Sequence, residues 1–322
     1  MNAVKSYLLA LESRMTNDPF SDVLNLISAR SVVSGSLVAG GSWAIRFPAS
    51  DRLNFWGIAR GSCWCVMEGE EPLFLEAGDF VLRAAPRVTL LATDLQATPV
   101  DFQNLTSSLG NVRHHGEGDD FLIVGGKVEF DARRGAPLLA SLPPTILIRH
   151  ESAHATVLQW LLSQLVRERA DGAPGVAAAS TQLAQLMFIQ ILRAHLDSDA
   201  ALAPGWLRLL GSRRLAPAVR LLHRDPAKAW GLEELANACS MSRATFAVHF
   251  KADAGITPVA YLTQLRMRLA ERTLREGDTS VSKVGYALGY SSESAFSNAF
   301  KRFAGEAPTR YRANARSGQA AN

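Results

Sequence analysis

The stretch VGYALGYSSESAFSNAFKRFAGEAPTRYR (Val284–Arg312) has an earlier counterpart in the same chain, LEELANACSMSRATFAVHFKADAGITPVAYL (Leu232–Leu262). Matching residues are offset by 49 positions in the first part of the two copies and by 50 in the second part. The later copy therefore carries one extra residue in between. A repeat at a fixed period indicates a duplicated supersecondary unit.

Each copy predicts two short helices joined by a tight turn. Ser242 and Ser292 are good N-cap residues for the second helix of each copy, and Ser280 caps the first helix of copy two. Phenylalanines four residues apart then form a buried stripe on each second helix, Phe246 with Phe250 and Phe296 with Phe300. The pattern is that of a helix-turn-helix, written twice.

A longer helix is expected between the two copies. Thr257 caps it, Pro258 occupies its first position, and it runs to about Arg275. Four leucines are expected to face inward and four arginines outward: Leu262, Leu265, Leu269 and Leu274, and Arg266, Arg268, Arg272 and Arg275. A stiff helix of this kind allows two units to enter successive major grooves, about 34 Å apart on B-DNA.

The distribution of charge supports a polyanionic partner for the repeat. The whole chain of 322 residues has a net charge of +4. Residues 1–210 hold 17 basic and 21 acidic residues, a balance of −4, and residues 211–322 hold 17 and 9, a balance of +8. The basic excess lies entirely in the part that contains the repeat.

The first 150 residues read as a β-barrel or β-sandwich after a short helix at about Val4–Glu12. Gly69 and the Gly78-Asp79 pair mark tight turns. The expected strands are Ser31–Val38, Trp43–Phe47, Phe55–Arg60, Cys63–Met67, Leu73–Glu76, Phe80–Ala84, Val88–Ala92 and Phe121–Phe130.

Two amphipathic helices are expected next, at about Ala155–Arg169 and Ala178–Leu196, followed by a linker at Asp197–Trp206. Their apolar faces must be buried on the barrel, on each other or on a second subunit. Covering the barrel and forming a homodimer are equally compatible with the pattern.

The barrel region lacks the histidine ligands expected of a metal-binding barrel. Residues 52–92 contain no histidine, and Trp56, Cys63, Arg87 and Thr89 stand where ligands would be sought. Cys63 and Cys65 share one strand face, where a core role is favoured over a redox or soft-metal pair. For the adjacent His114-His115 pair, a polar loop that leads into the next strand is favoured over a ligand or metal site. No cofactor and no metal are expected.

The residues 213–316 resemble the DNA-binding domain of the AraC/XylS family of transcriptional regulators, because both copies are close to that family's signature. Residues 20–150 resemble the cupin-like sensor domain of one branch, through GSCW (Gly61–Trp64), the Gly78-Asp79 pair and the His-His-Gly loop. The resemblance implies an α+β protein: an N-terminal cupin-like β-barrel with flanking helices, then an all-α domain of two helix-turn-helix units joined by a rigid helix.

The expected division is a cupin-like effector-sensing domain at 1–150, a helical dimerisation or linker region at 151–212, the double helix-turn-helix at 213–316 and a disordered tail at 317–322. The resemblance further implies double-stranded promoter DNA, RNA polymerase and a small-molecule effector as partners, and the function of an activator. Three free-standing cysteines, the lack of a signal peptide and the lack of a spanning segment predict a cytoplasmic protein without membrane contact.

On the second helix of each copy, the face opposite the phenylalanines is expected to meet DNA. The groove-facing residues are Arg243, Ala244, Ala247, Val248 and Lys251 in copy one, and Glu293, Ser294, Ser297, Asn298, Lys301 and Arg302 in copy two. Copy one offers methyl contacts and phosphate ligands, whereas Asn298 suits adenine and Glu293 suits a cytosine amine. Arg310 and Arg312 are expected at phosphates. For the effector, contact with Trp56, Trp64 and His114 is expected.

Two other functions remain open at this point. A cupin-type metalloenzyme fused to a DNA-binding tail would need metal ligands that residues 52–92 do not supply. An architectural DNA binder would not need the first 200 residues for regulation.

Overall fold

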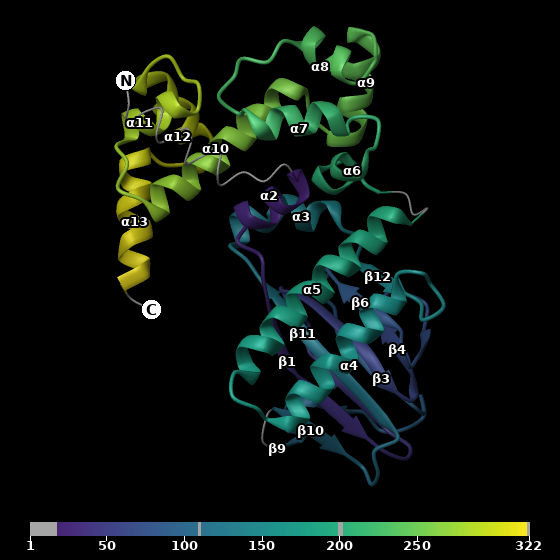
Figure 1. The fold of residues 1–322 in the computed structure, drawn as a ribbon. Helices are drawn as coiled ribbons and strands as arrows, with labels where there is room; N and C mark the ends of the chain where they lie inside the picture. The colour runs from purple at the N-terminus through teal and green to yellow at the C-terminus, as the bar shows by residue number, and fades with distance from the viewer. Residues whose placement is uncertain (1–17, 109–110, 199–201, 321–322) are drawn as a thin grey trace. The chain divides into compact units, whose positions relative to one another are not determined.

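The computed structural model describes residues 18–108, 111–198 and 202–320, and within these it forms two compact units (Figure 1). The sheet unit consists of residues 29–130 and 142–202, apart from the undescribed positions. The helical unit consists of residues 18–28, 131–141 and 203–320. The expected helix at Val4–Glu12 lies outside the described residues. The α+β class is confirmed.

The sheet unit contains two β-sheets. The seven-stranded sheet has the order β12-β6-β3-β11-β1-β10-β9, and the five-stranded sheet has the order β5-β4-β7-β2-β8. The strands are β1 (Arg30–Ala39), β2 (Ala44–Phe47), β3 (Leu53–Arg60), β4 (Ser62–Met67), β5 (Leu73–Glu76), β6 (Phe80–Arg83), β7 (Thr89–Ala92), β8 (Val100–Asp101), β9 (Thr106–Ser108), β10 (Val112–His115), β11 (Phe121–Glu129) and β12 (Thr145–Ile148).

The core of the sheet unit lies between the two sheets. Strand β4 shows why: its alternate residues Cys63, Cys65 and Met67 are buried in that core, while the residues between them are half-buried. This is the period-2 alternation of a strand with one face packed. Burial raises the pKa of Cys65 to about 12 and raises that of Cys63 further, so both remain thiols. Their interpretation as core residues is confirmed.

The Gly78-Asp79 turn is held by a fully buried carboxylate. Asp79 accepts hydrogen bonds from the backbone N–H of Glu76 (3.1 Å), the backbone N–H of His150 (2.8 Å) and Arg149 Nη1 (3.0 Å). Burial opposes ionisation, but these hydrogen bonds outweigh it and hold the pKa of Asp79 below its usual range. The turn between β5 and β6 is thereby fixed to the end of β12.

Two long helices, α4 (Ala155–Asp171) and α5 (Val176–Asp197), run side by side across the seven-stranded sheet (Figure 1). Helix α4 packs on β3, and α5 packs on β1 and β12. The buried faces of both helices therefore pack on the seven-stranded sheet. Some apolar side chains are left outward, among them Trp160, which is 59% exposed.

Several elements differ from the sequence expectations. His114 and His115 belong to strand β10, which pairs with β1 and β9, and not to a loop. Thr145–Ile148 is not among the expected strands, but it forms β12, because it pairs with β6 along its length. The expected disordered tail at 317–322 is also wrong in part, since the last helix extends to Ala320.

The helical unit is built from short helices. They are α2 (Pro19–Leu26), α3 (Ala132–Ser141), α6 (Trp206–Gly211), α7 (Ala216–Arg224), α8 (Leu232–Ala238), α9 (Arg243–Ala254), α10 (Pro258–Glu276), α11 (Val281–Ala287), α12 (Glu293–Ala304) and α13 (Pro308–Ala320). The predicted caps are confirmed: the side chains of Ser242, Thr257, Ser280 and Ser292 each accept a hydrogen bond from the N–H three residues on.

The turns of the two helix-turn-helix units match until their last residue. Ser240 (φ 53°) and Gly289 (φ 83°) are equivalent left-handed residues. The next residue in each turn donates its N–H back to the first helix, Met241 to Ala236 O and Tyr290 to Gly285 O, both at 3.0 Å. The extra residue of copy two is therefore Ser291, directly before the N-cap.

Helix α10 is buried on more sides than its leucines alone suggest. Arg268 was expected outward, but it is buried, its guanidinium lies over the rings of Trp206 and Phe303, and it donates to Arg134 O. Arg266 is half-buried and donates to three carbonyls at residues 226–228. These two arginines hold the unit together and are not available to DNA, because other segments cover the face they project from.

Two helices that come early in the chain complete the helical unit. Helix α2 packs on α7 and α10, and α3 packs on α6. Fully inside, His223 of α7 bridges Asp22 Oδ2 (3.1 Å from Nδ1) and Tyr261 Oη (2.7 Å from Nε2). Burial raises the pKa of Tyr261, so its hydroxyl stays protonated. Sequence order did not indicate that residues before 150 take part in this unit.

Candidate DNA interface and ligand pocket

The second helices of the two repeats, α9 and α12, present the same pattern of exposure. In α9, Arg243, Ala244, Val248 and Lys251 are exposed and Ala247 is half-buried. In α12, Glu293, Ser294, Asn298, Lys301 and Arg302 are exposed and Ser297 is half-buried. The four phenylalanines lie on the opposite faces, fully buried. All the residues expected to face DNA therefore lie on one outer face of their helix.

The two faces differ in chemistry. Val248 is 67% exposed at the centre of the α9 face, where it offers only methyl groups. The equivalent position in α12 is Asn298, which borders a shallow hollow with Lys301, Arg302 and Gly305. An amide beside two cations can hydrogen-bond a base edge while the cations meet phosphates.

The phosphate role expected for Arg312 is not supported. Arg312 is half-buried and donates a hydrogen bond to Thr279 O, which ties α13 to the segment before α11. Arg310 is exposed and lies 3.8 Å from Glu306 Oε2. Arg310 is therefore the more accessible of the two.

A buried carboxylate anchors the C-terminal end of α9. Asp253, 3% exposed, accepts hydrogen bonds from Arg208 Nε (3.0 Å), Ser212 Oγ (2.8 Å) and Arg214 Nη2 (3.2 Å). In α12 the equivalent position is Phe303, and the C-terminal carbonyl of Ala304 accepts from Arg133 of α3 at 2.6 Å. Helices α9 and α12 are thus each fixed at the C-terminal end, by different contacts.

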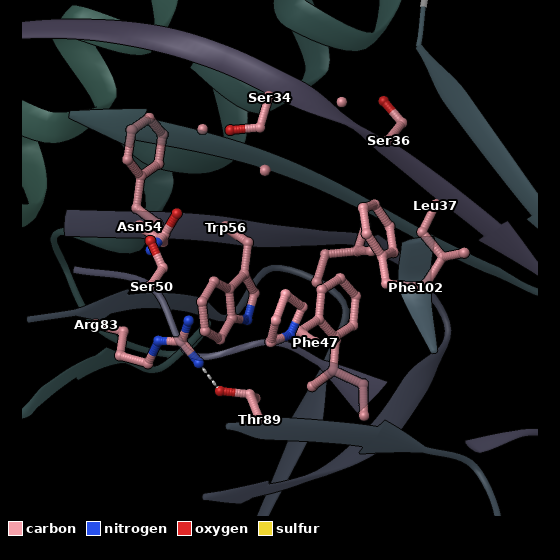
Figure 2. A pocket seen from close by; sticks show the side chains of 17 residues that line it. Ser34, Ser36, Leu37, Phe47, Ser50, Asn54, Trp56, Arg83, Thr89 and Phe102 are labelled. Carbon is pink, nitrogen blue, oxygen red and sulfur yellow. Dashed lines mark hydrogen bonds between the residues drawn. The ribbon is translucent and has the colours of Figure 1, made fainter. Parts of the chain in front are cut away.

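The sheet unit contains a cavity of about 230 Å³ (Figure 2). Gly35 of β1 and Gly125 and Gly126 of β11 line it with backbone, and of these three only Gly125 has room where a Cβ would stand. The rest of its lining is mostly apolar, with some hydroxyls, one amide and one cation: Ser34, Ser36, Leu37, Phe47, Pro48, Ser50, Asn54, Phe55, Trp56, Arg83, Thr89, Leu91, Phe102 and Ile123. The volume far exceeds the roughly 10–15 Å³ that one water needs.

Arg83 and Trp56 lie next to one another at this cavity (Figure 2). The Arg83 guanidinium lies 5.8 Å from the centre of the Trp56 ring and donates from Nη1 to Arg87 O (2.7 Å) and to Thr89 Oγ1. Burial lowers the pKa of Arg83, which nonetheless stays charged. The cavity therefore contains one fixed positive charge.

Of the three residues expected to contact an effector, the structure places Trp56 at the cavity and the other two elsewhere. Trp64 points away from the core and packs against Phe74, with ring centres 5.0 Å apart. His114 is exposed on β10. Thr89 also lines the cavity, whereas Arg87 pairs with Glu70 (3.2 Å).

Arg83 was missed by sequence reasoning, although a signal was present. It is a single charged residue in the apolar run FVLRAAP (Phe80–Pro86), and all four residues of β6 are buried. A buried charge in such a run indicates a function or a partner. Gly125-Gly126 in the middle of β11 was the second signal, because glycine inside a strand often marks close approach or space for a ligand.

Neither a metal site nor a membrane segment was found in the described ranges. No three His, Cys, Asp or Glu side chains there cluster so that they could hold a metal ion. None of the helices described is both long and apolar enough to cross a membrane.

The comparison with known families agrees with both parts of the chain. A cupin model matches residues 18–197, and a model of a helix-turn-helix domain matches residues 235–314. The solved structure of the DNA-binding domain of AdpA, in complex with a target DNA, is 32% identical and covers 34% of this chain and 100% of that one, with a TM-score of 0.33.

Full-length relatives are similar over both parts together. A putative AraC-like transcription regulator of Streptomyces lividans is 38% identical over 297 residues, which cover 92% of this chain and 98% of the relative. The regulator AlkR of Acinetobacter baylyi is 32% identical over 284 residues, covering 84% and 91%. These relatives are transcriptional regulators and not enzymes. The chain therefore belongs to the AraC family of helix-turn-helix transcriptional regulators and carries an N-terminal cupin sensor domain.

Proposed function

We propose that this regulator is an activator that binds promoter DNA in two successive major grooves and responds to a small-molecule effector held in the cupin cavity. The observation that carries the proposal is the shared exposure pattern of α9 and α12. Two helix faces with the same pattern of exposure on one chain suit two half-sites about 10–10.5 base pairs apart.

The two helices are proposed to contribute unequally. On α9, Arg243 and Lys251 contact phosphates, and Ala244, Ala247 and Val248 offer methyl contacts to thymine. On α12, Asn298 pairs with adenine and Glu293 accepts from a cytosine amine, with Ser294 and Ser297 beside them and Lys301 and Arg302 at phosphates. Copy one anchors the protein and copy two reads the sequence.

The effector is proposed to act by differential affinity. A ligand shifts an equilibrium only when it binds one conformation of the protein more tightly than another. The largely apolar cavity at Trp56 supports this role, since pockets of this kind bind small ligands. RNA polymerase is the partner through which an activator in the cytoplasm would act.

Replacing Asn298 with Ala is expected to lower the preference for one base pair by about 1–3 kcal/mol, because it removes a bidentate contact to a base edge. Val248→Ala, the matched change on α9, is expected to leave specificity almost unchanged, since a methyl group remains. Binding of the purified full chain to a randomised DNA library, followed by sequencing, measures both. Equal losses from the two changes would contradict the idea that copy two leads the readout.

A homodimer is proposed through the outer face of α4. Trp160 is 59% exposed there, although its neighbours Leu161 and Leu162 are buried. Trp160→Glu is expected to weaken self-association by about 2 kcal/mol or more, the size of an aromatic anchor, and to leave folding intact. Analytical ultracentrifugation over a range of concentrations measures this. A wild-type chain that stays monomeric at the highest concentration would contradict the proposal.

A further inference from the structure

The cupin cavity contains one buried cation that no acidic side chain compensates. Arg83 is 4% exposed, and no carboxylate lies within ion-pair distance of it in the described part of the chain. A buried charge without a counter-charge is unfavourable unless a partner arrives with the ligand. Because Arg83 lies on a cavity wall, a bound ligand can reach its charge.

Two hydrogen-bond donors at the cavity have no acceptor among the described residues, one on the guanidinium of Arg83 and one on the neighbouring Trp56 ring. Nε of Arg83 and Nε1 of Trp56 are both buried and have no hydrogen-bond partner within the described ranges. Both residues line the same cavity. Buried polar atoms in folded proteins are usually satisfied, and because these two donors line one cavity, a single bound acceptor can satisfy both.

The remainder of the cavity suits an apolar body. Phe47, Leu91, Phe102 and Ile123 line it, and Gly125 of β11 leaves room beside them. The single charge limits the ligand to a single negative charge. A dianion such as a phosphate monoester would bring a second charge with no compensating cation in the cavity.

We propose that the cavity binds a small amphipathic carboxylate, whose carboxylate accepts hydrogen bonds from Arg83 Nε and Trp56 Nε1 while its hydrocarbon part lies against the aromatic and aliphatic wall. The inference rests on the proposed function for its regulatory meaning, because it specifies the chemical class of the effector. Binding itself is independent of that function.

A purely structural role for Arg83 makes a different prediction. Its hydrogen bonds to Arg87 O and Thr89 Oγ1 also fasten β6 to β7. If that were its whole role, a change at Arg83 would distort the cavity and lower the affinity for carboxylates and alcohols equally. A change at Arg83 that lowers the affinity for carboxylates but not for alcohols would show that the positive charge recognises the ligand.

The test uses the full chain and isothermal titration with straight-chain carboxylates from butanoate to decanoate and benzoate, each against the alcohol of the same carbon skeleton. At least one carboxylate is expected to bind with a Kd below about 100 µM, and its alcohol at least about tenfold more weakly. Arg83→Gln should remove that preference and leave the affinity for the alcohol within about twofold. Phenyl phosphate should bind more weakly than benzoate.

A second variant keeps the proposal testable if Arg83→Gln does not fold. A Cβ added at Gly125 meets its nearest neighbours at ordinary contact distances of 3.7 and 3.9 Å, whereas at Gly126 it would lie 2.4 Å from the Phe55 ring. Gly125→Leu therefore fills the cavity without breaking the sheet and should abolish binding of carboxylate and alcohol alike. Carboxylates that bind Gly125→Leu as tightly as wild type would overturn the site.

The outcomes separate this inference from the proposed function. Equal affinity for carboxylates and alcohols, unchanged carboxylate affinity in Arg83→Gln, or no carboxylate binding in the series would each overturn the inference. DNA affinity is measured with and without each compound. Carboxylate binding that leaves DNA affinity unchanged supports this site and contradicts the effector response. A neutral compound that alters DNA affinity, with no carboxylate bound, overturns this site and supports the response.

Discussion

Asp253→Ala is expected to lower the free energy of unfolding of the helical unit by about 3 kcal/mol. Its carboxylate is the common acceptor for Arg208, Ser212 and Arg214, and its backbone carbonyl accepts from Gly205 N–H at 2.9 Å. Removing one partner of a buried ion pair usually costs about 3–5 kcal/mol. The lower end applies because both arginines are partly exposed and water can solvate them.

Urea-dependent hydrogen exchange on the full chain, read by mass spectrometry, measures the effect in α6 and α9. Peptides from the sheet unit serve as an internal reference, because the two units need not unfold together. Asp278→Ala is the matched control: this aspartate pairs with Arg316 but is almost fully exposed, so the change should cost less than about 0.5 kcal/mol. Similar losses from the two changes would contradict the role of burial.

The same carboxylate gives the stability of the helical unit a defined acid dependence. Burial opposes ionisation of Asp253, but the hydrogen bonds from Ser212, Arg214 and Arg208 outweigh it and place its pKa below the usual 3.8. A carboxyl group with a lowered folded-state pKa stabilises the fold above its unfolded pKa. This contribution is present at neutral pH and is lost as the pH falls from about 4 through the folded pKa. The Ala variant lacks that part of the acid dependence.

The helix-turn-helix scaffold could be predicted from the sequence because its determinants are local. Each cap is a hydroxyl residue three positions before the N–H it accepts from, and each phenylalanine pair lies one helical turn apart. The exposure of Val248 and Asn298 then follows from helical geometry alone, since these residues lie opposite the buried stripe. The single extra residue in the turn of copy two also follows from the offset.

The burial of individual arginines could not be predicted, because it depends on which distant segments cover their helices. Arg268 and Arg312 look like surface cations in the sequence, but each donates to a carbonyl of a distant segment. Arg268 meets Arg134 of α3, which lies 134 positions earlier and belongs to a stretch that sequence order assigns to the sensor. Local periodicity carries no information about such a partner, so charge alone suggested an outward direction.

The cavity illustrates the same limit in a sheet. Trp56 and Trp64 were both expected at a ligand site because they are aromatic. Strand β3 presents Trp56 to the cavity, whereas β4 presents Trp64 away from the core. Which face of a strand points inward depends on register, and a slip of one residue reverses it. The apolar run around Arg83 indicates that this charge is buried, but only the pairing of β6 with β3 shows that it lies beside the cavity.

Gly289→Ala is expected to destabilise the second helix-turn-helix by about 3–4 kcal/mol, the sum of about 1 kcal/mol for the left-handed backbone and about 2–3 kcal/mol for overpacking. An added Cβ would lie 2.0 Å from Ala227 O, and Gly289 has a φ of 83°. The carbonyl cannot move aside easily, because Arg266 holds it and the neighbouring carbonyls at residues 226–228.

Copy one supplies the matched control for this change. Ser240 occupies the equivalent turn position with a φ of 53° and already carries a Cβ, so Ser240→Ala adds no atom and should cost less than about 0.5 kcal/mol. Hydrogen exchange in α11 and α12 measures stability, and base preference in the Asn298 half-site measures the readout. Gly289→Ala should lower protection in α11 and α12 and weaken that preference, whereas Ser240→Ala should leave both unchanged. A loss below about 1 kcal/mol for Gly289→Ala would mean that the close approach to Ala227 is not kept in solution.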